Sequence, residues 1–228
     1  QTYEELAGAE NKIEILPESP NENKKLWQNT ENKPKIDLSK KLGGLKSIYT
    51  KKFIVIQGWC DSFCTFCLTV IKRWKHYYRT KEDIVDEITD FESRWWKEVV
   101  LTWVNLCAWW LEHTNDFKNS KFDELIKYIL EKTEIPRIRI SSLWPEFVND
   151  KVLKLFENKR IYPHFHYSIQ YWSSNVLKNM KRHYDWEYMR DLLIKTLNIK
   201  REDWVKVSIW ADLIVWFPGE TEDEFLDT

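Results

Sequence analysis

Three cysteines lie within eight residues of one another: Cys60, Cys64 and Cys67. Residues 52–57, Lys-Phe-Ile-Val-Ile-Gln, form an apolar run typical of a buried strand, so the thiols fall in the loop after that strand. In α/β proteins, ligands bind at this end of the strands. Clustered thiolates are the usual ligands of zinc and of iron–sulfur clusters. The spacing therefore predicts a metal centre on this loop.

Three interpretations of the loop are open at this point. A structural zinc ion usually has four ligands, and His76 would complete such a site. An iron–sulfur cluster held by only three cysteines leaves one iron free for a substrate or cofactor. The third interpretation is a loop of reduced thiols that binds no metal.

The elements that must position this loop alternate between strands and helices. Strands are predicted at 53–57, 98–102, 137–141 and 164–169, and within 205–216. Helices are predicted from Thr80 onward, at 121–132 with Ser120 as N-cap, at 150–158, 174–180 and 185–197, and from Thr221. This alternation predicts an α/β fold, with parallel strands joined by right-handed crossovers.

The residues around the cysteines resemble a known family. The stretch 53–67, FIVIQGWCDSFCTFC, with its C-x3-C-x2-C spacing, resembles the radical S-adenosylmethionine (SAM) enzymes and, more narrowly, their methylthiotransferase branch. The likeness continues through residues 98–105, 137–142, 163–170 and 212–221. It covers residues 49–228 and implies a truncated, partial (β/α)6 barrel.

The resemblance also implies cofactors. Cys60, Cys64 and Cys67 would hold a [4Fe-4S] cluster whose open iron binds SAM, and the reduced cluster would split SAM into methionine and a 5′-deoxyadenosyl radical. Phe63 and Phe66 are expected to keep water away from the cluster. Polar residues at the strand ends face the same edge and are candidates for binding SAM: Thr102, Asn105, Ser141, Ser142, Gln170 and Ser173.

Other polar residues have more ordinary interpretations beside the chemical one. His164 and His166 share one face of a strand, where a hydrogen-bonded pair is expected rather than a metal site. Cys107 is interpreted as a small apolar filler. Three arginines are candidates for binding a carboxylate or phosphate, or else carry surface charge: Arg73, Arg139 and Arg182.

The resemblance implies a function on tRNA. Family members add a methylthio group to a modified adenosine beside the anticodon. Residues 102–106 are most similar to the branch that acts on threonylcarbamoyladenosine, then to the isopentenyladenosine branch, and then to one that modifies a ribosomal protein. An alternative from another class is a zinc-stabilised RNA-binding module without redox chemistry.

The first 48 residues differ in character from the rest. They are polar and rich in Asn, Lys and Glu, and they contain no cysteine. Family members carry an N-terminal domain there, with a second [4Fe-4S] cluster that supplies sulfur. We interpret residues 1–48 as a linker and the tail of that domain, and residues 49–228 as an incomplete radical SAM core.

Composition sets further bounds. The 228 residues include 35 basic and 36 acidic side chains, so bulk charge does not demand a nucleic-acid partner. No apolar run is long enough to span a bilayer, and the chain shows no secretory signal. Four cysteines, three of them clustered, suit a metal site in a reducing compartment. We therefore expect a cytoplasmic protein.

Tryptophan and glycine are present in abnormal numbers. There are 14 Trp and 5 Gly, whereas average usage of about 7% predicts roughly 16 glycines. Many of the tryptophans stand at turn positions that favour glycine. We hypothesise that most are glycines in the living protein, encoded by UGA codons that its organism reads as glycine. The hypothesis covers eleven positions: 59, 74, 95, 96, 103, 110, 144, 172, 204, 210 and 216.

Overall fold

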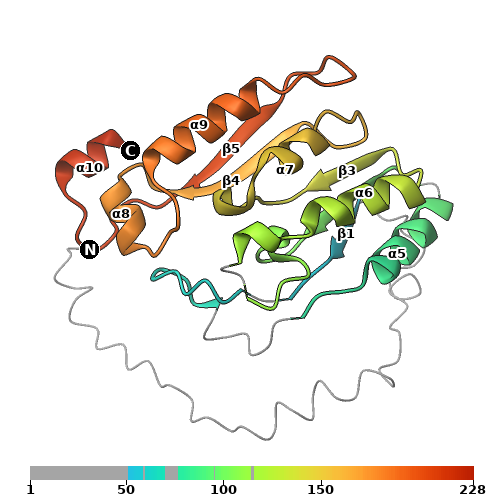
Figure 1. Cartoon of the computed structure of the whole chain (residues 1–228), viewed down its shortest axis with the longest axis horizontal. Coiled ribbons are helices and arrows are strands. Elements are labelled where there is room, and N and C mark those ends of the chain that lie inside the picture. The colour runs from blue at the N-terminus through green and yellow to red at the C-terminus, as the bar shows by residue number, and fades with distance from the viewer. Residues whose placement is uncertain (1–50, 59, 70–76, 95, 114–115) are drawn as a thin grey trace, which may run out of the picture. The chain divides into compact units, whose positions relative to one another are not determined.

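The computed structural model describes residues 51–228, except for 59, 70–76, 95 and 114–115. These residues belong to one compact unit that spans 49–228. The strands are β1 (Lys52–Val55), β2 (Glu98–Thr102), β3 (Arg137–Ile140), β4 (His164–Gln170) and β5 (Ser208–Leu213). The helices are α5 (Lys81–Ser93), α6 (Phe122–Lys132), α7 (Asp150–Leu155), α8 (Ser174–Asn179), α9 (Trp186–Leu197) and α10 (Glu222–Asp227) (Figure 1). Residues 1–48, interpreted as a linker, lie outside the described residues.

The strands are parallel, as predicted from the alternation of strands and helices. β1 pairs with β2 and β2 with β3, while β4 pairs with β5. Between β3 and β4 the ladder is reduced to two isolated parallel bridges, Ile138 with Ile161 and Leu143 with Tyr167. The five strands thus follow one another in chain order, as a partial (β/α) barrel requires, with a weak seam after β3.

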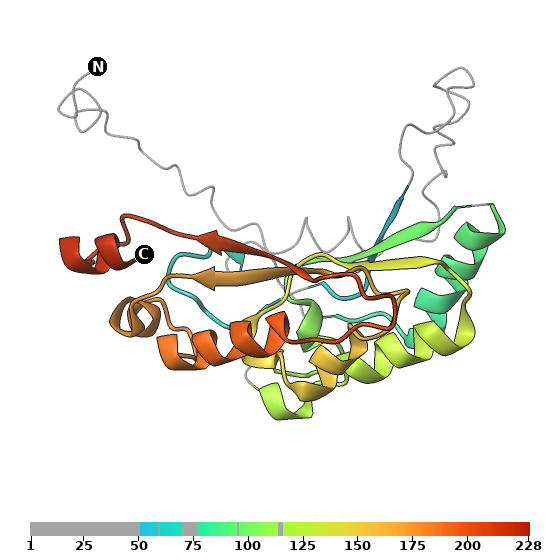
Figure 2. The ribbon, with the colours of Figure 1, turned by 90° about the horizontal axis from the view of Figure 1, so that it is seen from above.

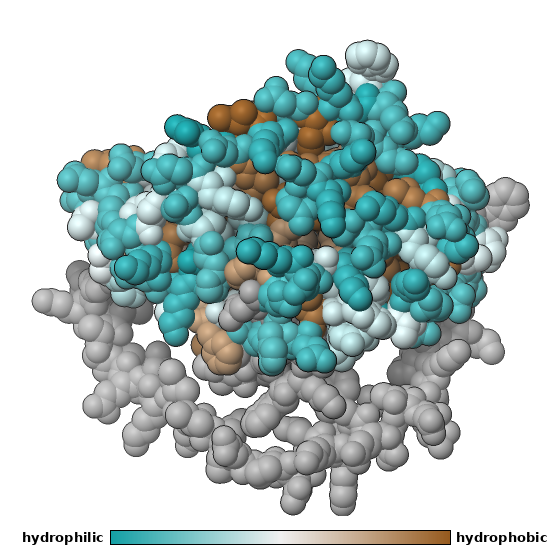
Figure 3. Space-filling view, viewed as in Figure 1, coloured by the Kyte–Doolittle hydropathy of each residue, from teal (hydrophilic) through white to brown (hydrophobic). Residues whose placement is uncertain are grey.

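The helices α5, α6, α7 and α9 all lie on one face of the strands (Figure 2). Their apolar sides form the core with the strand residues that point toward them; Ile84, Ile88 and Phe91 of α5 are buried there. On β4, Phe165 stacks on Phe156 with 3.9 Å between ring centroids. The outer side of the helix layer is largely hydrophilic (Figure 3). The opposite face of the strands is therefore the one available for chemistry.

The sequence-based bounds needed small corrections. The prediction that Ser120 is the N-cap of α6 is wrong by one residue, because Lys121 occupies that position. Ser120 still contributes, since its hydroxyl accepts a hydrogen bond from the Phe122 amide at 3.3 Å. Helix α7 ends at Leu155 rather than at residue 158.

Seven described residues other than glycine have a positive φ, and four of them are tryptophans. These are Trp103 (φ 138°), Trp110 (69°), Trp204 (60°) and Trp216 (63°). A side chain with a Cβ costs about 1–2 kcal/mol in the left-handed region, and glycine avoids this cost. All four are among the positions at which we hypothesise glycine. Their backbone is the kind that glycine favours, while the codon assignment itself stays a prediction.

Candidate cluster and cofactor site

The cysteine loop leaves the carboxyl end of β1 and is anchored at the end of α8. The amide of Thr65 donates to the carbonyl of Met180 at 3.3 Å, and its hydroxyl donates to the carbonyl of Asn179 at 3.1 Å. Within the loop, the Cys67 amide donates to the Cys64 carbonyl at 3.0 Å, which closes a tight turn. The loop is thus held by contacts that lie more than 110 residues away in the sequence.

The three thiols are reduced and differ in exposure. Cys60 and Cys64 are buried, and Cys67 is half-buried. Burial raises the pKa of the Cys60 thiol, which donates a hydrogen bond to the Ser62 hydroxyl at 3.4 Å. Burial also raises the pKa of Cys64, and the nearby guanidinium of Arg182 opposes this shift. The amide of Thr69 lies 3.5 Å from the Cys67 sulfur and donates to it.

The donor set fits an iron–sulfur cluster better than a single ion. Within the described ranges, no three Cys, His, Asp or Glu side chains converge on a point where one metal ion could bind. A [4Fe-4S] cluster does not need such convergence, because each thiolate binds a different iron atom. Three free thiols on one loop, two of them shielded from water, would supply the ligands of a cluster with one open iron. His76, the candidate fourth zinc ligand, lies outside the described residues.

The two phenylalanines between the cysteines behave differently. Phe66 is half-buried and packs against the hydrophobic core. Phe63 is 57% exposed and has a φ of 50°. Phe66 is therefore the better placed of the two, and the shielding role of both residues stays a prediction.

Asn105 is the most unusual of the predicted SAM-binding residues. Its side chain is fully buried, yet among the described residues neither Oδ1 nor Nδ2 has a hydrogen-bond partner. Leaving a buried polar group without a partner costs on the order of 1–3 kcal/mol. The side-chain amide of Gln57, just before the cysteine loop, donates to the Asn105 carbonyl and so ties the two loops together. This buried, unsatisfied amide beside the cysteine loop is what a polar ligand such as SAM would complete.

The remaining predicted SAM contacts divide into two groups. Ser142 and Ser168 share a hydrogen bond at 3.1 Å, and Thr102 ends β2 beside the Asn105 loop. Ser141 uses its backbone, because its carbonyl lies 3.2 Å from His166 Nδ1. These residues stay candidates for contact with SAM.

Ser173 and Gln170 already have structural roles. The Ser173 hydroxyl is the N-cap of α8, accepting from the Val176 amide at 3.3 Å and donating to the Glu224 carboxylate at 2.7 Å. Gln170 ends β4 with a φ of 72°. Their contact with SAM stays a prediction.

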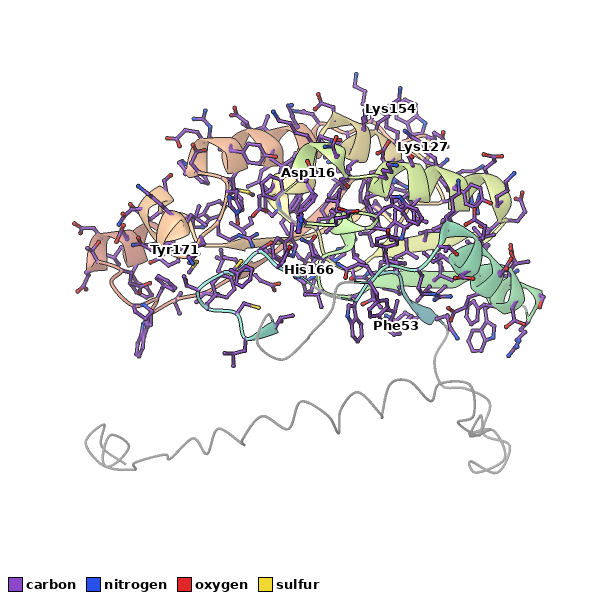
Figure 4. The ribbon with its side chains drawn as sticks, turned by 60° about the horizontal axis from the view of Figure 1, so that its bottom comes forward. Phe53, Asp116, Lys127, Lys154, His166 and Tyr171 are labelled. Carbon is purple, nitrogen blue, oxygen red and sulfur yellow. The ribbon has the colours of Figure 1, made fainter. Side chains whose placement is uncertain are left out.

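The polar face of β4 carries the two histidines, and Figure 4 shows His166 on the side of the strands away from Lys127 and Lys154. His164 Nδ1 lies 3.0 Å from the Ser208 hydroxyl, and His166 Nε2 lies 3.0 Å from the Asp212 carboxylate. Burial, followed by the charges of Arg139 and His166, lowers the pKa of His164. Each histidine therefore bonds to β5 rather than to the other, and sequence reasoning missed the partners Ser208 and Asp212.

The other predicted polar residues have clear positions. Arg139 lies over the Tyr162 ring, 5.4 Å from its centroid. Cys107 is fully buried, and burial raises its pKa to about 12, which suits an inert filler. Arg73 lies outside the described residues.

Arg182 is not a surface charge, because its side chain is 1% exposed and pairs with Glu146 at 3.2 Å. Glu146 carries no signal in the sequence that would have identified it.

A parallel α/β domain with three free thiols on the loop after its first strand has the form of an iron–sulfur enzyme. The model of the Radical SAM superfamily matches residues 54–228, and the chain belongs to this superfamily. Members of this family use a [4Fe-4S] cluster and SAM, and the residues described above fit both.

Curated relatives are tRNA-modifying enzymes. The chain is 34% identical over 181 residues to the tRNA-2-methylthio-N(6)-dimethylallyladenosine synthase of Clostridium perfringens strain SM101, covering 78% of this chain and 38% of that protein. It is 32% identical over 182 residues to the threonylcarbamoyladenosine tRNA methylthiotransferase MtaB of Treponema pallidum, covering 79% and 35%. The chain thus spans well under half the length of these relatives.

Solved structures support the fold. The radical SAM methyltransferase TsrM of Kitasatospora setae aligns with a TM-score of 0.60 at 13% identity, covering 77% of this chain and 31% of that one. Methylornithine synthase aligns with a TM-score of 0.50 at 16% identity, covering 72% and 44%. These identities are too low to carry more than the radical SAM fold. Among the described residues, no helix is both long and apolar enough to cross a membrane.

Proposed function

We propose that this chain is the radical SAM part of a methylthiotransferase that adds a methylthio group to a modified adenosine beside the anticodon of tRNA. The names of its relatives support this substrate class, and they include both the dimethylallyl and the threonylcarbamoyl types. The observation that carries the proposal is the unsatisfied side-chain amide of Asn105, a residue whose backbone carbonyl Gln57 ties to the loop of buried thiols.

In this proposal the chain's own residues hold and shield the cofactors. Cys60, Cys64 and Cys67 would bind the cluster, and Asn105 would complete its hydrogen bonds with a polar group of SAM. When bound, the cluster supplies the electron that cleaves SAM. Phe66 and the core behind it would limit water at the reacting atoms.

Three further parts of the proposal rest on the family. A second [4Fe-4S] cluster would be bound by a separate N-terminal domain and supply sulfur. The partner would be tRNA, and the working compartment would be the cytoplasm. A methylthiotransferase that acts on a ribosomal protein is the alternative substrate class, and a zinc-stabilised RNA-binding module is the alternative outcome of the test below.

Anaerobic reconstitution of the full chain tests the proposal. We expect a brown protein that contains iron and sulfide and that forms 5′-deoxyadenosine from SAM in the presence of a reductant. Asn105→Ala is expected to keep the iron and to bind SAM at least tenfold more weakly. A colourless protein that binds zinc and no iron would contradict the proposal and favour the RNA-binding module.

A further inference from the structure

Arg182 is buried against the middle cysteine of the loop. Its side chain is 1% exposed, and Nη1 lies 3.5 Å from the Cys64 sulfur, to which it donates. We propose that Arg182 is a positioning residue that donates a hydrogen bond to the Cys64 thiolate of the cluster-loaded protein. With Glu146, it sets the reduction potential of the cluster. This inference rests on the proposed cluster site.

The guanidinium is fixed on every side. Nη2 donates to the Ser168 carbonyl at 3.1 Å and to the Glu146 carboxylate at 3.2 Å, while Nε donates to the Tyr184 hydroxyl at 3.3 Å. The Tyr184 hydroxyl in turn donates to the same Ser168 carbonyl at 3.1 Å. These bonds occupy Nη2 and Nε and leave Nη1 directed at Cys64. The planar fork of arginine makes this arrangement possible, and lysine cannot reproduce it.

The ion pair is unusual in being almost wholly buried. The Glu146 side chain is 2% exposed, and burial raises its pKa while Arg182 opposes that shift. A buried pair of this kind is weak evidence for stability, because desolvation offsets much of the attraction. The pair lies at a proposed cluster ligand, since Arg182 donates to Cys64 across 118 residues of sequence. This position points to a role in tuning that ligand. The Trp144 ring, 4.4 Å from the guanidinium, adds a cation–π contact that the proposal does not need.

The electrostatic effects of the two residues have opposite signs. Hydrogen bonds to the sulfurs and the net charge near a cluster set its reduction potential. A positive N–H donor at Cys64 stabilises the reduced, more negative form and raises the potential. The Glu146 carboxylate lowers it. A purely structural role would not produce shifts in opposite directions.

Reconstituted full-length variants test the inference by redox titration followed with electron paramagnetic resonance. For Arg182→Gln we expect the ratio of reduced to oxidised cluster at a fixed solution potential to fall about tenfold, about 59 mV for one electron. For Glu146→Gln we expect the ratio to rise. Arg160→Gln is the matched control, because the Arg160 side chain is held elsewhere, where it donates to the carbonyls of Leu130, Thr133 and Ile135 at 2.7–2.9 Å. That variant should melt earlier with an unchanged potential.

The outcomes separate the two proposals. A parent chain that takes up no iron and sulfide would refute the proposed function itself. A loaded Arg182→Gln variant with the parent's potential would overturn the role of Arg182 alone. If Arg182→Gln loses iron but keeps the parent's cooperative melting, the loss supports positioning of Cys64. If the variant loses both its iron and its cooperative melting transition, Arg182 has a structural role and the inference is overturned.

Discussion

The hydroxyl of Ser173 donates a hydrogen bond to the carboxylate of Glu224 at 2.7 Å and so joins the start of α8 to α10. The same carboxylate accepts from Asn175 at 3.0 Å and from the Thr221 amide at 2.9 Å, where it completes the capping box of α10. One carboxylate therefore holds together two helix starts that lie about fifty residues apart.

These contacts predict a pH dependence for α10. The backbone hydrogen bond from Thr221, followed by those from Asn175 and Ser173, lowers the pKa of Glu224 to about 2 from the ordinary 4.5. Because the folded-state pKa is depressed, the stabilisation is fully present above pH 4.5 and is lost as the pH falls through about 2. Glu224→Gln should speed hydrogen exchange of the α10 amides at pH 7, and this difference should shrink toward pH 2.

Glu222 provides the control for that measurement, because it lies in the same first turn and takes no part in these hydrogen bonds. Glu222→Gln should leave the exchange of α10 close to that of the parent. Equal exchange in the two variants at pH 7 would show that the bridge to α8 does not hold α10.

Cys64→Ala should abolish cluster binding and SAM cleavage while leaving the fold largely intact. The residue lies on a loop outside the sheet, so its loss removes a ligand rather than a large part of the core. Iron content, 5′-deoxyadenosine formation and thermal melting check this. Cys107→Ala is the control, since that thiol is fully buried in the hydrophobic core and should leave the iron content unchanged. Parent-level 5′-deoxyadenosine from Cys64→Ala would contradict the cluster assignment.

Asn105→Leu should stabilise the SAM-free chain and weaken SAM binding. Leucine has a similar shape and removes an amide that has no partner, a gain on the order of 1–3 kcal/mol. Thermal melting with and without SAM measures both effects. A variant that melts earlier than the parent and binds SAM equally well would show that Asn105 has partners in the protein itself.

Returning the tryptophans with positive φ to glycine should stabilise the chain. Trp204 and Trp216 are 92% and 75% exposed, so their rings bury little, while relief of the left-handed backbone is worth about 1–2 kcal/mol at each site. A variant with glycine at all eleven hypothesised positions should therefore be more soluble, and bind SAM better, than the chain that carries tryptophan at these positions. Urea unfolding and SAM titration compare the two.

Trp109 is the matched control for this comparison. It is 3% exposed, its φ is −55°, and its indole N–H donates to the Arg79 carbonyl at 2.9 Å. Trp109→Gly should therefore cost about 3–5 kcal/mol. If the literal chain folds and binds SAM as well as the glycine variant, or if mass spectrometry of the native protein finds tryptophan at positions 103 and 216, the recoding hypothesis is wrong.

The local features of this protein could be predicted from its sequence. Apolar periodicity placed the strands and helices to within a few residues, because burial on one face imposes its spacing on neighbouring positions. The spacing of Cys60, Cys64 and Cys67 after a strand predicted the cluster loop, because three ligands close in sequence must also be close in space. The helix starts at Thr80 and Thr221 could be predicted because a capping side chain bonds to a backbone amide only a few residues further along the chain.

Contacts between side chains far apart in the sequence could not be predicted, because they depend on how the elements pack. Arg182 reaches Cys64 across 118 residues, and Ser173 reaches Glu224 across 51. No sequence pattern identifies Glu146, because its role depends on burial against Arg182 rather than on its neighbours in sequence. The sequence does not show that the side-chain amide of Asn105 lacks a hydrogen-bond partner among the described residues, because this depends on which groups pack around it. Periodicity and spacing encode contacts along the chain, whereas contacts across it depend on how the elements pack.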